Sequence, residues 1–592
     1  MSRIRLPSAP MVARLVRVRL ARLGTYIPTW LLRLGLGEDV VLLIIGGLVG
    51  LLAGLAILGF YHLLALADVT AESLSERLAL PAFWVHLAVL LVGIGLARFL
   101  VRAGTHDSQG ENVPAVMQAV ARLGGRLPLA PILVKTLAAA LVIGSGGSVG
   151  AEGPVAVLGA GTASGTGRWF RFSPERLRLL VGCGAAAGIS GAFGAPIAGL
   201  FFAVEKIIGS LQTTNFGPLV VASVTAAAVT RNTLGVHTAL IRMPQVQGSW
   251  SAIDFAFAAG LGVVGGAVGV LYTRAIWIGK DLLARMAIPW RVLLAAGLIA
   301  ALYALVEPRL LGVGTLNLGD LERTGAALLL ALVLAKIAAT SLTLAAAEVG
   351  GLFAPAIVTG ALLGTAVGVV IRQAGVSEAA SPEAYALLGM AALVAGSAHA
   401  PLTAIFIVLE MSGDWGIIVP LLLAGALSYV VARSLYHDSV YSEWLTRRGE
   451  RIAHGADESV LGRLHVSDAL DSHPVTLRAS QPVDEMLRGL SSAPRPEYPV
   501  VDAAGRLVGM LAFTDLHRLL ADPAAVSGQR VGEVAHPATE VVTTGDSLLT
   551  VLKKMGTRDA PLLPVVDGVE SRRLVGVVGR KEVFAAYDAA TA

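Results

Sequence analysis

The chain has 592 residues, of which 55% are hydrophobic and only 15% are charged. Soluble domains of this length are far less apolar, so we predict a polytopic membrane protein. The pI near 9.4 does not indicate a nucleic-acid-binding protein, because the basic residues are scattered through loops and chain ends. The single cysteine, Cys183, excludes an intrachain disulfide and a cysteine-based metal site, and we expect no metal.

The first 37 residues form a basic segment. Six arginines lie in its first 22 residues, and no acidic residue precedes Glu38. Because positively charged segments beside membrane spans stay in the cytoplasm, we expect a cytoplasmic N-terminus and a location in the plasma (inner) membrane. The competing interpretation is a transit peptide, which we do not favour because no second, soluble destination is evident.

Residues 38–450 are predicted to form an all-α membrane domain. Long apolar runs recur through this region, and about 20 such residues span a bilayer. Other apolar segments are shorter or carry Gly and Pro, which predicts half-spanning or tilted helices. The long runs are 40–66, 84–100, 218–229, 255–270, 292–305, 326–347 and 417–431.

A repeated pattern in this domain indicates an internal duplication. A Gly is followed after eleven residues by an Ala-Pro pair, and a Glu lies nine residues after the Pro, in two copies 205 residues apart. Two Gly/Pro breaks, Gly150-Ala-Glu152-Gly-Pro154 and Gly351-Leu-Phe353-Ala-Pro355, extend the repeat. We therefore predict two repeats, about 38–232 and 252–435, whose interrupted helices meet at a midplane site. The two copies are Gly184, Ala195, Pro196 and Glu205, and Gly389, Ala400, Pro401 and Glu410.

The composition changes to that of a soluble α/β repeat in the last part of the chain. After a linker at 451–462, strand-like and helix-like runs alternate in two copies within 463–592, at about 463–522 and 530–590. The sequences Pro-Val-Val-Asp and Leu-Val-Gly occur in both copies. This region resembles a pair of CBS domains, a cytosolic regulatory module.

The CBS resemblance implies a nucleotide site in the first copy only. In that family a hydrophobic-Thr-Asp sequence at the start of the final helix often holds a nucleotide ribose, and Phe513-Thr514-Asp515 fits this pattern. The second copy has Arg580-Lys581-Glu582 instead. Two interpretations stay open: an adenine nucleotide at Thr514 and Asp515 as the only cofactor, or a structural and dimer-contact module in which Asp515 caps its helix.

The membrane motifs together resemble the CLC chloride channel and transporter family. The resemblance rests on the break at 150–154, on Gly350-Gly351-Leu352-Phe353-Ala354-Pro355, on the two Ala-Pro…Glu copies and on Tyr441. It implies a homodimer that is not an enzyme, with two inverted repeats per subunit and a separate anion pathway in each. The implied activity is either a channel or a proton exchanger.

The physics of ion transfer supports an anion site at the two breaks. A bare anion in hydrocarbon needs fixed donors in place of its lost hydration, and a full positive charge would bind it too tightly for turnover. Helix N-termini supply unpaired N–H groups and about half a positive charge. The resemblance adds the hydroxyl of Tyr441, for which an interfacial role is the alternative. The expected main-chain ligands are Ala151, Glu152, Gly153, Leu352 and Phe353.

Glu152 is the predicted gate. A carboxylate placed at amides that suit an anion occupies the ion site when it is ionised and leaves when it is protonated or displaced. Such a gate responds to pH and to the anion concentration. The alternative is a glutamate that only stabilises a helix N-terminus near water.

Two residues depart from the CLC pattern. The family's Gly-Ser-Gly-Ile-Pro stretch aligns with residues 110–114, which places Glu111, beside Asn112, where an anion-binding Ser is usual. Exchangers usually have two adjacent carboxylates after the first Ala-Pro motif, but here the pair is Glu205-Lys206, which favours a channel or an uncoupled transporter. A snorkelling role is the alternative for Lys206.

A second hypothesis follows from Glu111 and Glu348. With Glu152 they could form an acidic cluster, which is expected of a secondary active transporter coupled to protons or to a cation and carrying chloride, bicarbonate or another anion. A membrane sensor that signals through the CBS pair is a third interpretation. The broken helices do not favour the sensor, because they serve no evident purpose without an ion.

Overall fold

The computed structural model divides the chain into two compact units, Met1–Ile452 and Ala453–Ala592. Residues 1–36 of the basic N-terminal segment, Glu111 and Thr514 lie outside the described residues. The structure describes residues 37–67, 74, 80–104, 112–209, 213–234, 241–242, 250–305, 316–317, 321–376, 380–448, 456–489, 496–512, 515, 528–538, 540–558, 560–568 and 570–591.

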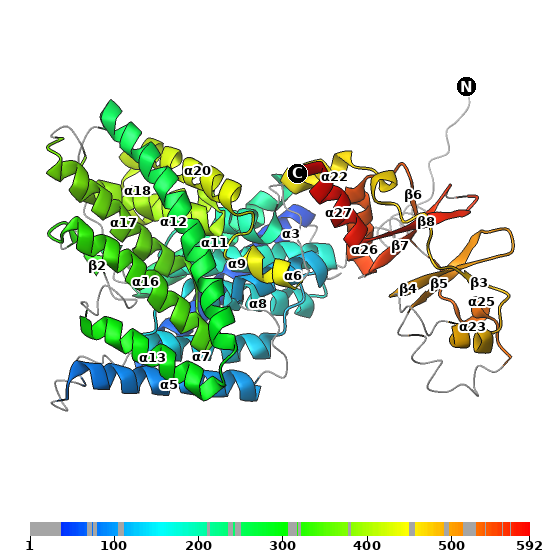
Figure 1. Ribbon diagram of the computed structural model, residues 1–592, viewed down its shortest axis with the longest axis horizontal. Coiled ribbons are helices and arrows are strands. Elements are labelled where there is room, and N and C mark those ends of the chain that lie inside the picture. The colour runs from blue at the N-terminus through cyan, green and yellow to red at the C-terminus, as the bar shows by residue number, and fades with distance from the viewer. Residues whose placement is uncertain are drawn as a thin grey trace, which may run out of the picture. The chain divides into compact units, whose positions relative to one another are not determined.

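The first unit is a bundle of helices (Figure 1). Two short strands, β1 (Ile241–Arg242) and β2 (Leu316–Asn317), pair in parallel beside it. The helices are α3 (Glu38–Ala67), α5 (Ala82–Gly104), α6 (Asn112–Arg122), α7 (Leu129–Gly144), α8 (Glu152–Trp169), α9 (Pro174–Phe193), α10 (Pro196–Phe202), the π-helix η1 (Ala203–Ile208), α11 (Thr213–Leu234), α12 (Ala252–Ala284), α13 (Ile288–Leu305), α16 (Ala326–Ala347), α17 (Phe353–Gln373), α18 (Pro382–Ala398), α19 (Pro401–Ser412), the 3-10 helix η3 (Trp415–Ile417), α20 (Ile418–Leu435) and α21 (Ser442–Arg447).

Seven helices among the described residues are long and apolar enough to cross a membrane. Six of them contain predicted apolar runs, and the seventh, α17, carries the second Gly/Pro break at its start. The predicted run 218–229 lies in α11, whose apolar part, Phe216–Arg231, is shorter than these seven. The seven candidate spans are Asp39–Ala67, Ala82–Gly104, Ala252–Ala284, Ile288–Leu305, Ala326–Ala347, Phe353–Gln373 and Trp415–Leu435.

The helices of the two halves follow the same order. The helix after each break, α8 or α17, packs against the next one, α9 or α18, and the short helices α10 and α19 that follow pack against each other. The first helix of each half packs against its last, α3 against α11 and α12 against α20. In Figure 1, α5 and α13 lie side by side along one edge of the bundle.

Local sequence explains how corresponding helices begin. Both α9 and α18 start with Ser-Pro-Glu, and the N-cap hydroxyls of Ser173 and Ser381 each accept a hydrogen bond of 3.4 Å from a first-turn amide. A Pro at the first helical position needs no N–H partner there. Both helices end at a residue in the left-handed conformation, Gly194 or His399, and the Ala-Pro pair follows.

The second unit contains the two predicted α/β copies, which confirms the sequence-based expectation of a tandem repeat. Each copy has a three-stranded sheet in which the first two strands pair in parallel and the last two pair antiparallel. Main-chain pairing between Arg506 and Arg573 joins the two copies. The elements are α22 (Ala456–Arg463), the 3-10 helix η4 (Val466–Ala469), β3 (Leu477–Arg478), α23 (Val483–Gly489), β4 (Glu497–Val501), β5 (Leu507–Ala512), α25 (Val531–Val534), β6 (Val542–Thr543), α26 (Leu548–Arg558), β7 (Leu562–Val566), β8 (Leu574–Gly579) and α27 (Arg580–Thr591).

Candidate functional site

The two Gly/Pro breaks meet inside the membrane unit. The amide of Gly150 donates to the carbonyl of Gly351 at 2.9 Å, and the amide of Gly351 donates back to Gly150 at 2.7 Å. This antiparallel bridge joins the residues that precede α8 and α17. The N-terminal ends of two helices from different repeats, with their unpaired amides, therefore lie at one place.

The side chain of Glu152 lies at this meeting point. It is buried, with 2% of its surface exposed, and its Oε1 accepts a hydrogen bond of 2.5 Å from the main-chain amide of Phe353. Its Oε2 is also buried and has no hydrogen-bond partner among the described residues. The carboxylate of the first repeat thus lies on the first amide of the helix of the second repeat.

Glycine is required on both sides of this carboxylate. A Cβ at Gly150 would lie 1.9 Å from Glu152 Oε2, and a Cβ at Gly351 would lie 2.2 Å from Oε1. Both distances are far below van der Waals contact. The glycines of the breaks therefore leave the space that the carboxylate occupies.

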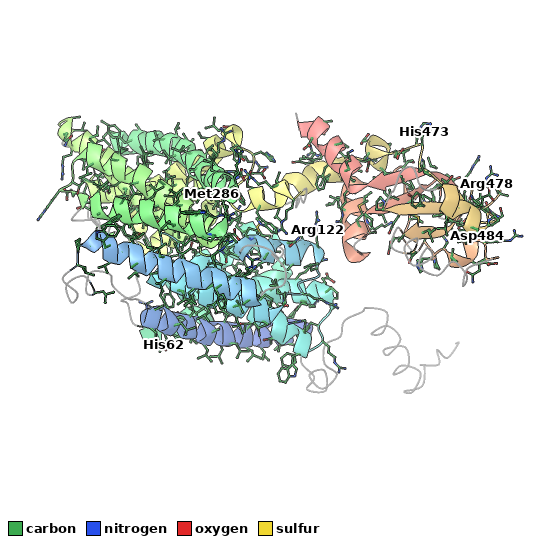
Figure 2. The ribbon with its side chains drawn as sticks, turned by 60° about the horizontal axis from the view of Figure 1, so that its bottom comes forward. His62, Arg122, Met286, His473, Arg478 and Asp484 are labelled. Atoms are coloured by element: carbon green, nitrogen blue, oxygen red, sulfur yellow. The ribbon has the colours of Figure 1, made fainter. Side chains whose placement is uncertain are left out.

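A small cavity lies beside the breaks. Its volume of about 20 Å³ suffices for one water molecule or a small ion. Figure 2 labels Arg122, which ends α6, and Met286, which follows α12; both helices contribute to the wall. The lining residues are Asn112, Pro114, Gly153, Ile276, Trp277, Lys280, Leu344, Gly350, Gly351, Leu352, Val440, Tyr441 and Trp444.

Four residues of the predicted anion site line this cavity, namely Asn112, Gly153, Leu352 and Tyr441. Ala151 is the N-cap of α8. Tyr441 is only 4% exposed, and the nearby Tyr436 instead donates a hydrogen bond to Glu443 at 2.5 Å.

Two supporting contacts were absent from the predicted site. Asn112 has a left-handed backbone, with φ of 46°, and its amide Nδ2 donates to the carbonyl of Gly350 at 2.5 Å. The hydroxyl of Tyr272, on α12, donates to the carbonyl of Leu352 at 2.8 Å. Both bonds hold the second break in place from a distant part of the chain.

Glu205 and Glu410 have every carboxylate oxygen hydrogen-bonded, unlike Glu152. Glu205 accepts bonds from the amides of Leu402 and Thr403, both at 2.9 Å, and from the Thr403 hydroxyl at 2.6 Å. Glu410 accepts bonds from the amides of Ile197 at 3.0 Å and Ala198 at 2.8 Å. These contacts point to a structural role for both glutamates, because each carboxylate holds the start of a helix.

The remaining candidates for ion coupling have different surroundings. Lys206 lies in η1 and is 7% exposed. Glu348 forms ion pairs with Arg98 at 2.6 Å and Arg291 at 2.8 Å, which compensate its charge. Among the described residues, the ion pairs of Glu348 are with these arginines, and Glu152 binds the Phe353 amide. These contacts do not support the expected acidic cluster.

In the second unit, Asp515 is the only member of the predicted nucleotide pair that the structure describes. Its Oδ2 accepts a hydrogen bond from the amide of Ala512 at 3.2 Å and lies 3.2 Å from Nε2 of His536. Within the described ranges, no group of three or more His, Cys, Asp and Glu side chains is arranged to hold a metal ion. A nucleotide at Asp515 stays a prediction.

In this chain, helices of membrane length are interrupted, and the interrupted ends face one buried site. This arrangement is typical of ion-transporting membrane proteins. Residues 91–433 match the family described as Voltage gated chloride channel, and residues 466–522 and 531–589 match the CBS domain. The chain therefore belongs to the voltage-gated chloride channel (CLC) family and is a multi-pass integral membrane protein with a C-terminal CBS pair. This family contains channels and transporters and no enzymes.

Several known proteins are similar to this chain. A ClcB-like chloride channel protein of Ralstonia nicotianae is 34% identical over 420 residues, which cover 69% of this chain and 97% of the relative. The voltage-gated ClC-type chloride channel ClcB of Escherichia coli is 30% identical over 416 residues, covering 68% and 98%. The solved structure of a eukaryotic CLC transporter has the same fold, with a TM-score of 0.66, 20% identity and coverage of 91% of this chain and 97% of that one.

Proposed function

We propose that this protein conducts chloride through a separate pathway in each subunit of a homodimer and that Glu152 is the gate. The observation that carries the proposal is the hydrogen bond from the Phe353 amide to the Glu152 carboxylate. A carboxylate bound to an unpaired helix amide stands where an anion would bind. The ClcB relatives are named as chloride channels, which supports chloride as the ion.

The site binds an anion without binding it too tightly. The amides at the starts of α8 and α17 supply partial positive charge, and the nearby Tyr441 supplies a hydroxyl. No full positive charge is needed at the centre, so the ion can leave again. When the Glu152 carboxylate is protonated or displaced by chloride, the same donors become available to the ion.

The hydrogen bonds of the two carboxylate oxygens of Glu152 also suit a side chain that moves. A buried oxygen without a partner costs about 1–3 kcal/mol, whereas a fully bonded carboxylate stays in place. Glu205 and Glu410 have a partner at each oxygen, but Glu152 has one only at Oε1 among the described residues. Glu152 thus differs from these two glutamates in keeping one buried carboxylate oxygen without a partner.

Uncoupled chloride conduction is the activity that the residues favour over exchange. Lys206 lies where exchangers of this family usually have a proton-carrying carboxylate. An ammonium group does not ordinarily transfer protons as a carboxylate does. Glu348, a candidate for coupling, is ion-paired with Arg98 and Arg291. We further propose that the N-terminus and the CBS pair lie on the cytoplasmic side and that the CBS pair regulates conduction.

Reconstitution in liposomes tests the gate. Glu152→Gln keeps the shape of the side chain but removes its charge, so chloride flux should rise and its pH dependence should flatten. The matched control is Glu175→Gln, an exposed glutamate at the start of α9, which should behave as wild type. Unchanged flux and pH dependence in Glu152→Gln would contradict the gate.

The reversal potential tests the mode of transport. With the wild-type protein, the voltage of zero net current should follow the chloride gradient alone. A shift of this voltage when a pH or sodium gradient is imposed would favour the coupled transporter. The same measurement with bicarbonate or nitrate in place of chloride defines the selectivity.

A further inference from the structure

Ser148 connects the first Gly/Pro break to a helix of the other half of the membrane unit. It lies just before Gly150, in the segment between α7 and α8, and it is fully buried. Its main-chain amide donates a hydrogen bond to Thr343 Oγ1 at 3.1 Å, and its hydroxyl lies 3.1 Å from Thr340 Oγ1. Both threonines lie on α16 and are fully buried. Two hydrogen bonds therefore attach this segment to α16.

The direction of these two bonds follows from the other partners of the threonines. Each hydroxyl carries a single proton. Thr340 donates its proton to the carbonyl of Lys336 at 2.9 Å, and Thr343 donates its proton to the carbonyl of Ala339 at 2.7 Å. Both threonine oxygens therefore accept from Ser148, whose N–H and O–H donors are both bound to α16. A buried donor that loses its acceptor is costly, so these bonds fix Ser148 in place.

A third hydrogen bond from the second half reaches the same segment. The hydroxyl of Tyr303, on α13, donates to the carbonyl of Gly146. Tyr303 is buried, and the ring of His86 on α5 packs edge-on against its ring, with 5.6 Å between the centroids. Gly146 has a φ of 89°, which glycine adopts readily and other residues do not. The segment is thus held at Gly146 by α13 and at Ser148 by α16.

The helix that binds Ser148 also leads into the second break. Gly351 in that break forms the main-chain bridge to Gly150. The first break is therefore attached to side chains of α16 at Ser148 and to the continuation of α16 at Gly150. Because Glu152 follows shortly after Gly150, these two attachments fix where its carboxylate lies relative to the Phe353 amide.

We propose that Ser148, Thr340 and Thr343 form a clasp that positions the Glu152 carboxylate on the Phe353 amide and so determines how completely the gate closes. This inference rests on the proposed function and adds three positioning residues that the sequence motifs do not include. The two threonines bind Ser148, so they act on the gate through the first break. A weakened clasp loosens the segment that leads to Glu152, and the ionised carboxylate then closes the pathway less completely.

Chloride flux in liposomes over a series of pH values tests the clasp. An ionised Glu152 closes the pathway, so wild-type flux should be low at high pH and rise in acid. Thr343→Val keeps the shape of the side chain but removes the acceptor of the Ser148 amide. The ratio of flux in acid to flux at high pH should therefore fall roughly three- to tenfold, which corresponds to the loss of one hydrogen bond. Thr343→Ser keeps the hydroxyl and should restore most of the wild-type ratio.

The matched control is Thr365→Val on α17. Thr365 is also fully buried, and its hydroxyl donates to the carbonyl of Ala361 at 2.8 Å, as the hydroxyl of Thr343 does to Ala339. Among the described residues, the hydrogen bond of Thr365 stays within its own helix. Thr365→Val should therefore keep the wild-type flux ratio even where it lowers the melting temperature.

A double-mutant cycle tests the second bond of the clasp and keeps the test valid if Thr343→Val fails to fold. Ser148→Ala and Thr340→Val remove the same hydrogen bond from its two ends. Each should lower the flux ratio, and the two together should do little more than either one alone. Flux is compared per amount of folded protein, and the melting temperature of each variant is measured alongside.

The outcomes separate this inference from the proposed function. A lowered melting temperature with the wild-type flux ratio in Thr343→Val and Thr340→Val would make the clasp purely structural and overturn the inference. An increase in flux that persists in a Glu152→Gln background would overturn it too, because the clasp acts through that carboxylate. If Glu152→Gln alone leaves flux and its pH dependence unchanged, the proposed gate fails first, and the clasp fails with it.

Discussion

Glu205 and Glu410 each cap the helix that begins at the Ala-Pro motif of the other repeat. The Glu205 carboxylate receives the first free amides of α19, and the Glu410 carboxylate receives those of α10. A two-fold relation between the repeats produces this reciprocal pattern. The reciprocal caps explain why the same spacing from Pro to Glu occurs in both copies, because the Glu of each copy binds the helix start of the other copy.

The first prediction is that these caps stabilise the fold and leave conduction unchanged. Glu410→Ala removes two hydrogen bonds to helix amides, so the free energy of unfolding should fall by about 1–2 kcal/mol. Glu205→Ala removes three and should cost at least as much. Thermal unfolding in detergent measures the loss, with the exposed Glu175→Ala as the control.

Flux normalised to folded protein distinguishes this structural role from a role in ion transfer. Both variants should keep the wild-type reversal potential. A shifted reversal potential in Glu205→Ala would instead place that glutamate on an ion or proton route.

The second prediction concerns the space around the gate. Gly150→Ala would place a Cβ 1.9 Å from Glu152 Oε2, and the atoms nearest to this Cβ all belong to the Glu152 side chain. The carboxylate should be displaced, so chloride flux should rise as it does in Glu152→Gln. The control is Gly165→Ala on the same helix, where an added Cβ meets nothing within 4 Å.

A double variant makes this prediction more specific. If Gly150→Ala acts through the carboxylate, it should add little in a Glu152→Gln background. Additive increases in flux would show that the added methyl group acts on the main chain instead.

Patterns close together in the sequence predicted most of the fold. The offset of 205 residues identified the duplication, and Pro-Val-Val-Asp with Leu-Val-Gly identified the second α/β unit. Both follow from local chemistry, since Gly and Pro interrupt helices and period-two apolar runs form strands. The Ser-Pro-Glu sequences that begin at Ser173 and Ser381 are a further repeat signal, because each starts the corresponding helix of its half.

The side chains that complete the site could not be predicted in this way. Trp277 and Tyr272 reach the second break from α12, about 75 to 80 residues away, and no motif surrounds them. The carboxylates of Glu205 and Glu410 were recognisable as a pair, but their partners lie across the repeats. No sequence signal predicts the π-helix η1 either. The spacing from Pro196 to Glu205 equals that from Pro401 to Glu410, although the second segment is entirely α-helical.

The third prediction concerns pH and the second unit. Burial raises the pKa of Glu497 at the start of β4, and the negative charge of Asp515 raises it further. A raised pKa in the folded state means that folding favours the protonated acid. This stabilising effect is complete below the ordinary Glu pKa and is lost as the pH rises through the raised value.

Glu497→Gln imitates the protonated form at every pH. The variant should therefore stabilise β4 and β5 at neutral pH and match wild type in acid. Hydrogen exchange of these strands in the full chain, corrected for the intrinsic pH dependence of exchange, measures the difference. The exposed Glu570→Gln is the control, and equal protection of Glu497→Gln and wild type at neutral pH would contradict the prediction.

The fourth prediction separates the two contributions of Asn112. Its left-handed backbone suits Asn and Gly but costs other residues about 1–2 kcal/mol, and its amide holds the carbonyl of Gly350. Asn112→Gly should lose only the hydrogen bond, about 1 kcal/mol, whereas Asn112→Ala should lose that bond and add backbone strain. Thermal unfolding should show wild type as the most stable, Asn112→Gly as the next and Asn112→Ala as the least stable.

Because the hydrogen bond of Asn112 positions the second break, both variants should also weaken chloride binding, and by a similar factor. A larger loss of binding in Asn112→Ala alone would show that backbone strain, and not the loss of the side-chain amide, disturbs the anion site.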